Sequence, residues 1–235
     1  MEITAATFKE PYAATRRRLV RRTQLAWLTS LGSKVGTLAT QVLAVPAVYR
    51  TIGQDGYAAY AAVTSTVSIL GALNLGIGGS LVTPVAQAAA LGDHAREGQL
   101  CRAGLVPLVL ICLTALLLAL PALTLLPLPA LLGEAARTKV VGLREALVLA
   151  GVITLVSLPL TVVGNLRQAY QELHITYLIG AASNAVLCGA LLAAAFGGAS
   201  LPVFVACFAG IPMMGSVLNG YFLRSEEHTS ELQSR

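Results

Sequence analysis

Residues Ala103–Gly133 read AGLVPLVLICLTALLLALPALTLLPLPALLG, and no side chain in this stretch carries a charge. An α-helix rises about 1.5 Å per residue, so about 20 apolar residues cross the hydrocarbon core of a bilayer. Lipid offers the backbone no hydrogen-bond partner, so a spanning segment must be a helix or belong to a closed barrel. The stretch lacks the ten-residue alternation of barrel strands, which predicts a membrane-spanning helix.

Similar stretches recur along the chain, and the composition agrees with them. At 56% hydrophobic and 11% charged residues, the chain lies far from the soluble average of roughly 25% charged. We therefore expect an all-α integral membrane protein with a lobe of six transmembrane helices. The six apolar segments are Gln24–Tyr49, Gly56–Gly92, Ala103–Gly133, Ala146–Leu166, Ile175–Phe196 and Leu201–Leu223.

Basic residues cluster directly before the first segment, in a block of arginines. The block comprises Arg16, Arg17, Arg18, Arg21 and Arg22. Such a block is the usual cytoplasmic flank of a membrane helix, so no nucleic-acid partner is expected despite the net charge of +5.

The loops predict a topology with the N-terminus in the cytoplasm. Met1–Thr23, Gln87–Arg102 and Arg167–Thr176 then lie inside and hold nine basic residues, against four in the outside loops. This arrangement obeys the positive-inside bias. It requires Gly56–Gly92 to form one long, tilted helix, although the glycines of Gly76–Gly79 could break it.

Polar side chains form stripes on three of the expected helices. In the first helix the stripe is Ser30, Lys34, Thr37 and Gln41, whose spacing places them on one face, while Leu31, Val35, Leu38 and Val42 occupy another. The other two stripes are Tyr60, Thr64, Ser68, Gly71 and Asn74, and Thr154, Ser157, Thr161, Asn165 and Gln168. Small and hydroxylated residues also mediate helix packing, so the stripes indicate either helix contacts or a shared hydrophilic cavity.

Lys34 is the most informative member of these stripes. It lies about 14 Å into the span when counted from Leu25, where a lysine costs about 2.5–3.5 kcal/mol on insertion scales. We expect it to face a cavity, and the alternative is a side chain that reaches the interface or a backbone carbonyl. No carboxylate lies deep in any of the six segments.

Enzymatic motifs are missing from the sequence. It contains no HExxH, Walker loop, GxSxG or cluster of metal ligands, so we expect no catalysis, metal or cofactor. The four cysteines, Cys101, Cys112, Cys188 and Cys207, show no CxxC or histidine pairing, and three of them lie within apolar segments. We expect them to be packed small apolar residues rather than part of a disulfide or metal site.

The last stretch, Arg224–Arg235, reads RSEEHTSELQSR and differs from the rest in character. It resembles the translation of a common sequencing adapter through Ser234, so we expect it to be a non-native tail. On this interpretation the chain divides into a basic N-terminus at Met1–Thr23, a transmembrane lobe at Gln24–Leu223 and the tail. We then expect a longer native protein whose C-terminal lobe is missing here.

Several short motifs occur in order within Gly32–Gln99. These are GSK at Gly32–Lys34, YRTIGQDGY at Tyr49–Tyr57 and LNLGIG at Leu73–Gly78, and GNLRQAYQ follows later at Gly164–Gln171. Together they resemble the N-terminal lobe of Wzx-type polysaccharide flippases, within the multidrug/oligosaccharidyl-lipid/polysaccharide exporter superfamily. Asn74 departs from that pattern, because aspartate is frequent at its position.

The resemblance implies half of a two-lobe exporter that works by alternating access in the bacterial cytoplasmic membrane. Such flippases carry undecaprenyl-diphosphate-linked oligosaccharides to the outer leaflet during polysaccharide, lipopolysaccharide or O-antigen synthesis. The implied partners are this lipid-linked oligosaccharide, membrane lipid and the second lobe. Lys34 is the candidate for the anionic headgroup, and the candidates for the sugar are Gln41, Asn74, Thr161 and Asn165.

Two other functions remain open. A cation-coupled multidrug exporter of the same superfamily would share the fold, but its coupling usually needs a buried carboxylate. A non-transporting scaffold subunit would instead bury the polar stripes in contacts between helices.

Overall fold

The computed structural model describes residues 9–72, 76–125 and 142–233, and within these ranges every regular element is a helix. The elements are α1 (Lys9–Ala39), the π-helix η1 (Thr40–Ala44), α2 (Val45–Gly71), α3 (Ile77–Ala90), α4 (His94–Leu125), α7 (Leu143–Ala169), α8 (Leu173–Phe196) and α9 (Leu201–Gln233). Five helical stretches are long and apolar enough to cross a membrane. The chain is therefore an all-α, multi-pass membrane protein, as predicted.

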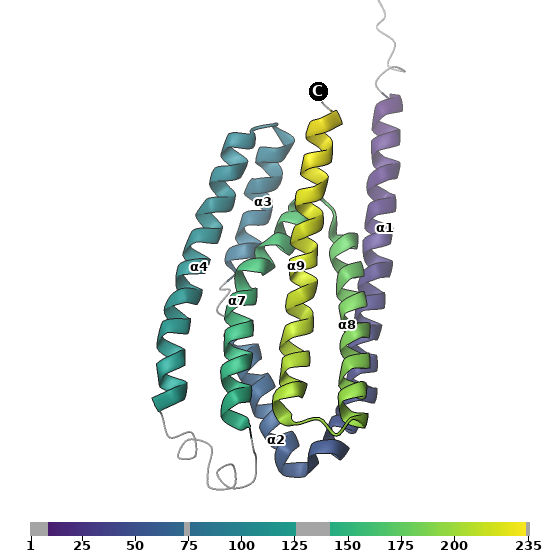
Figure 1. Cartoon of the computed structure of the whole chain (residues 1–235). Coiled ribbons are helices and arrows are strands. Elements are labelled where there is room, and N and C mark those ends of the chain that lie inside the picture. Colours follow the sequence, from purple (N-terminus) through teal and green to yellow (C-terminus); the bar gives the residue numbers. More distant parts are fainter. Residues whose placement is uncertain (1–8, 73–75, 126–141, 234–235) are drawn as a thin grey trace, which may run out of the picture.

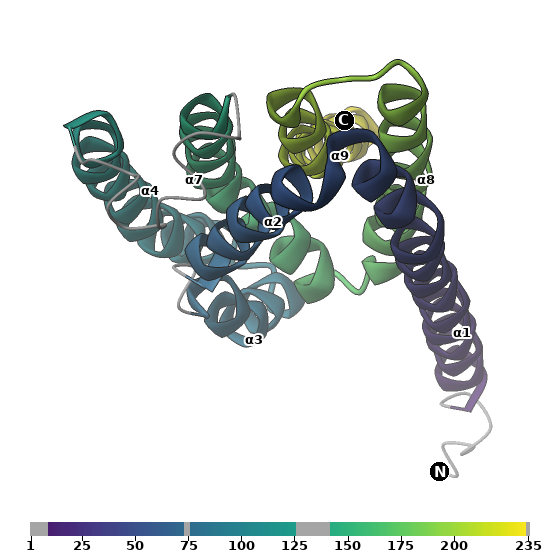
Figure 2. The same cartoon turned by 90° about the horizontal axis from the view of Figure 1, so that it is seen from below.

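The helices stand side by side (Figure 1). α7 packs against α9, and α8 joins α9 to α1, while α3 and α4 pack on the other side of α7. Seen from below, α2 passes across the lower end of the bundle, where it contacts α7, α8 and α9 (Figure 2). The opposite end, called the upper end here, carries the start of α1, the α3–α4 loop and the end of α9 (Figure 1).

Apolar side chains form two buried clusters between the helices. The first joins η1, α2, α7, α8 and α9 around Val48, Val63 and Phe204. The second joins α3, α4 and α7 around Val85 and Leu108. Because lipid is as apolar as these side chains, close packing rather than escape from water holds such clusters together.

One face of α1 and η1 lies outside this packing. Leu31, Val35, Leu38 and Val42 are 64%, 58%, 63% and 68% exposed. These four side chains form the apolar stripe of the first segment. Their exposure on a membrane-spanning helix is what contact with lipid requires.

The first helix does not end at Tyr49, because the chain continues through η1 into α2. η1 ends two residues before Pro46, which has no N–H for a regular helical hydrogen bond. The chain turns at Gly53 inside α2, where φ is 71° and ψ is −177°. This conformation is open to glycine alone, so the Gly53 turn replaces the expected loop between the first two spans.

The prediction of one long helix over Gly56–Gly92 was wrong. α2 ends at Gly71 and α3 begins at Ile77, after Gly76 in the left-handed conformation with φ of 71°. The glycine run of Gly76–Gly79 thus does break the segment. α2 and α3 follow one another from the lower to the upper end (Figure 1).

Two other boundaries also differ from expectation. α7 extends through Ala169, so Arg167 belongs to a helix rather than to the inside loop Arg167–Thr176. At the end of the chain, α9 continues as a helix through Gln233 and includes most of the segment Arg224–Arg235. A polar segment can extend a helix beyond the apolar part because its backbone hydrogen bonds stay within the helix.

Candidate functional site

A cavity of about 600 Å³ lies between α1, α3, the end of α7 and the start of α8. We call it the upper pocket. Its described lining consists of Thr23, Ala26, Trp27, Ser30, Val82, Gln168, Gln171, Leu173 and Tyr177. Ser30 and Gln168 are the ends of two polar stripes found in the sequence, so the stripes of α1 and α7 meet at this pocket.

The lining combines four kinds of side chain. Gln168 and Gln171 contribute amides that both donate and accept hydrogen bonds, and Thr23 and Ser30 contribute hydroxyl groups. Two aromatic residues, Trp27 and Tyr177, and three aliphatic ones complete it. Trp27 is 77% exposed and therefore forms part of the rim. No charged side chain is among the described lining residues.

The α7–α8 turn brings Gln171 to the pocket in a strained conformation. Gln171 has φ of 60° and is the one residue other than glycine with positive φ in the described ranges. Its N–H donates to the carbonyl of Gln168 at 3.1 Å, and the N–H of Glu172 donates to the carbonyl of Arg167 at 2.8 Å. The left-handed conformation costs about 1–2 kcal/mol for a residue with a Cβ, so the surrounding structure must hold it.

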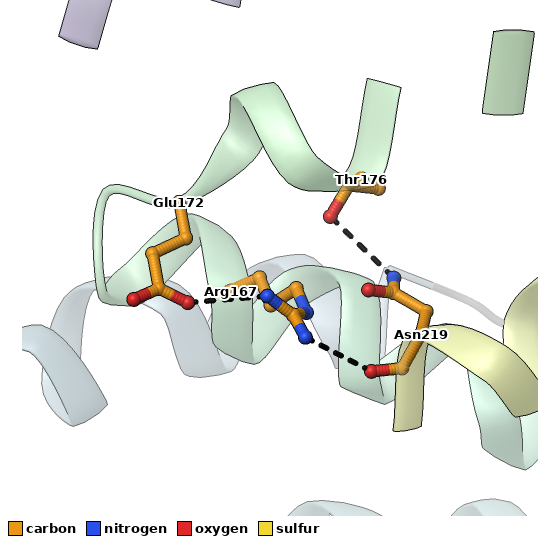
Figure 3. A network of polar contacts seen from close by, with 4 residues as sticks. All are labelled: Arg167, Glu172, Thr176 and Asn219. Atoms are coloured by element: carbon orange, nitrogen blue, oxygen red, sulfur yellow. Dashed lines mark hydrogen bonds and ion pairs between the residues drawn. The ribbon is translucent and has the colours of Figure 1, made fainter. Parts of the chain in front are cut away.

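A buried polar network lies directly behind this turn (Figure 3). The Arg167 side chain is completely buried. Its Nη1 lies 3.3 Å from Oε2 of Glu172, and its Nη2 donates to the carbonyl of Asn219 at 3.2 Å. Nδ2 of Asn219 in turn donates to Oγ1 of Thr176 at 3.4 Å. The network thus joins the end of α7, the start of α8 and α9.

Sequence reasoning missed this role of Arg167, because it treated the residue as a cytoplasmic loop charge. The available signal was its place one residue before Gln168 of the polar stripe, with Glu172 five residues later. An arginine buried in a helical bundle needs a carboxylate or carbonyl partner within reach, and Glu172 and Asn219 provide both.

The predicted site residues do not form one constellation. Thr161 and Asn165 lie half-buried on α7, where Asn165 Nδ2 donates to the carbonyl of Thr161 at 3.1 Å. Asn165 packs against Gly78 of α3, whose missing side chain leaves room for the amide. Lys34 and Gln41 are exposed on α1 and η1. Asn74 lies outside the described residues.

The α1 stripe divides between two surroundings. Thr37 faces α8, where Nδ2 of Asn184 donates to its Oγ1 at 3.1 Å and to the carbonyl of Ser33 at 3.2 Å. Lys34 lies one helical turn from Ser30, toward the lower end. Within the described residues the Lys34 ammonium makes no hydrogen bond or ion pair, so no described protein group compensates its charge.

The described ranges contain no group of His, Cys, Asp and Glu that could hold a metal ion. The four cysteines form no disulfide within the described residues. The described polar groups of the upper pocket are amides, hydroxyl groups and the polar atoms of two aromatic side chains. The chain matches no protein-family model, and no curated protein or solved structure is significantly similar to it.

Proposed function

We propose that the chain is a lobe of a flippase that carries an undecaprenyl-diphosphate-linked oligosaccharide across the bacterial cytoplasmic membrane by alternating access. The observation that carries the proposal is Lys34, a cation inside a membrane-spanning helix that makes no hydrogen bond or ion pair with the described residues. Burying such a charge is costly unless it has a functional partner. A lipid diphosphate is an anionic partner that reaches this depth in a membrane.

The order of groups along α1 supports this partner. The exposed apolar stripe of Leu31, Val35, Leu38 and Val42 offers a surface for a lipid chain. Lys34 borders that stripe between Leu31 and Val35, and Ser30 at the upper pocket lies about 6 Å further toward the upper end. Val35, Leu38 and Val42 lie on the lower side of Lys34. This apolar part, Lys34 and Ser30 therefore follow one another as lipid chain, diphosphate and sugar do in the proposed substrate.

Binding to the diphosphate can be tested on the chain itself. The purified protein in nanodiscs of phosphatidylcholine would be titrated with undecaprenyl diphosphate and with uncharged undecaprenol, and complexes would be counted by native mass spectrometry. We expect binding of the diphosphate that falls about 10- to 100-fold in Lys34→Ala, the usual range for a hydrogen bond to a charged group. Lys34→Arg should retain part of the affinity, because it keeps the charge with a different geometry.

Arg50→Ala is the matched control, because Arg50 is also an exposed cation but lies toward the lower end of the bundle. Equal losses in Arg50→Ala and Lys34→Ala would mean general attraction of an anion and would contradict the proposal. Preferential binding of a cationic dye would favour the drug exporter, and binding of neither ligand would favour the scaffold subunit. In cells that carry the gene, Lys34→Ala should stop glycan export while the amount of protein in the membrane stays the same.

A further inference from the structure

We infer that the upper pocket binds the first sugar units of the substrate. These sugar units are uncharged and carry many hydroxyl groups. This deepens the proposed function and rests on it for its biological meaning. It assigns the sugar to Gln168, Gln171, Trp27 and Tyr177, whereas only Gln41, Asn74, Thr161 and Asn165 were candidates from the sequence. The test needs neither transport nor a diphosphate.

The chemistry of the lining fits a sugar ring. A pyranose has hydroxyl groups around its edge and apolar C–H groups on its faces. The amides of Gln168 and Gln171 supply donors and acceptors for hydroxyl groups without a net charge. Trp27 and Tyr177 supply flat apolar surfaces with one polar group each, suited to a C–H face. A diphosphate or a cationic drug would instead need an oppositely charged side chain.

The turn that carries Gln171 is well defined. Gln171 lines the pocket with φ of 60°, and its N–H and that of Glu172 bond to the carbonyls of Gln168 and Arg167, which is the Schellman end of a helix. The ion pair of Arg167 with Glu172 and the hydrogen bond between their backbones hold this turn in place. Arg167 is therefore a positioning residue for the pocket.

Trp27 makes the inference directly measurable, because it is the single tryptophan of the chain. With a nanodisc scaffold protein that lacks tryptophan, the emission reports on the rim of the upper pocket alone. The protein in phosphatidylcholine nanodiscs would be titrated with dodecyl glucoside, dodecyl maltoside and dodecyl N-acetylglucosaminide. A polyoxyethylene detergent with the same dodecyl chain serves as the control without a sugar.

We expect a saturable change in Trp27 emission with at least one glycoside and none of similar size with the polyoxyethylene detergent. The double variant Gln168→Ala/Gln171→Ala should weaken glycoside binding about 10-fold or more, since two hydrogen-bonding amides are lost. Gln99→Ala, which removes an exposed amide from α4, should bind like the wild type.

Three outcomes would overturn the inference. Equal responses to glycosides and the polyoxyethylene detergent would identify a groove for acyl chains. No response to any of the ligands would leave Trp27 as an interfacial anchor. Unchanged glycoside binding in the double variant would place the sugar elsewhere. Loss of diphosphate binding in Lys34→Ala is read separately, so the proposed function and this inference can fail independently.

Discussion

Lys34 and Arg167 are both basic residues within apolar helices, but the structure treats them in opposite ways. Arg167 is 0% exposed and is held by Glu172 and Asn219. Lys34 is exposed on α1, beside an apolar stripe, and makes no hydrogen bond or ion pair with described residues. Depth in the membrane alone therefore does not show whether a charged side chain is structural or available to a ligand; its protein partners do.

The largest expected effect separates the two residues by stability. Arg167→Met removes one member of a buried pair and should lower the free energy of unfolding by about 3–5 kcal/mol, because Glu172 is left without its cation. Equilibrium unfolding in mixed detergent micelles would measure it. Arg102→Met, at an exposed arginine of α4, should stay within about 0.5 kcal/mol. Similar stability of the two variants would contradict the structural role of Arg167.

A smaller loss is expected where α1 is attached to the rest of the lobe. Asn184→Ala removes two hydrogen bonds from α8 to Ser33 and Thr37 of α1, which should cost about 1–2 kcal/mol. Thr66→Ala is the control, because that hydroxyl group bonds only within its own helix. If Asn184→Ala matched Thr66→Ala in the same unfolding assay, the attachment would depend on packing alone.

Relief of strain next to Arg167 should give a gain. Gln171→Gly removes the cost of a left-handed Cβ residue but adds the backbone entropy of glycine, so we expect about 0.5–1 kcal/mol of added stability. The same variant should bind dodecyl glycosides more weakly, because the amide is lost. If Gln171→Gly neither gained stability nor lost glycoside binding, this turn would have no role in holding a ligand.

The smallest effect on stability is expected at Lys34 itself. Lys34→Ala should change the free energy of unfolding by less than about 0.5 kcal/mol, since the ammonium group has no described partner to lose. Its effect should appear in binding of undecaprenyl diphosphate instead. A loss of stability comparable to that of Arg167→Met would show that Lys34 is structural and would remove the contrast between the two residues.

The sequence predicted the helices well because length and hydropathy are averages over many residues. Ala103–Gly133 and Ile175–Phe196, for example, coincide largely with α4 and α8. The backbone angles of a single residue are not averages. The sequence therefore did not decide whether the helix breaks at Gly76, and the prediction of one unbroken helix was wrong. The stripes correctly marked Ser30 and Gln168, which line the upper pocket.

What the sequence could not provide were contacts between distant positions. Asn184 was not singled out at all, since its partner Ser33 lies 151 residues earlier. Arg167 looked like a loop charge because a sequence near a helix end does not show which side chains fold inward. Its partner on α9 is the backbone carbonyl of Asn219. Every residue has such a carbonyl, so the residue type at this position does not indicate the contact.

The π-helix η1 has a consequence for how the lower end of the bundle is aligned. A π-turn accommodates one residue more than an α-turn, and each residue rotates the helix face by about 100°. Ala44 and Val48 are both 0% exposed, so their inward direction depends on that added rotation. Deleting one residue from Thr40–Ala44 would therefore rotate the following helix and turn Val48 out of the apolar cluster. It would also present a different side of the chain at the Gly53 turn.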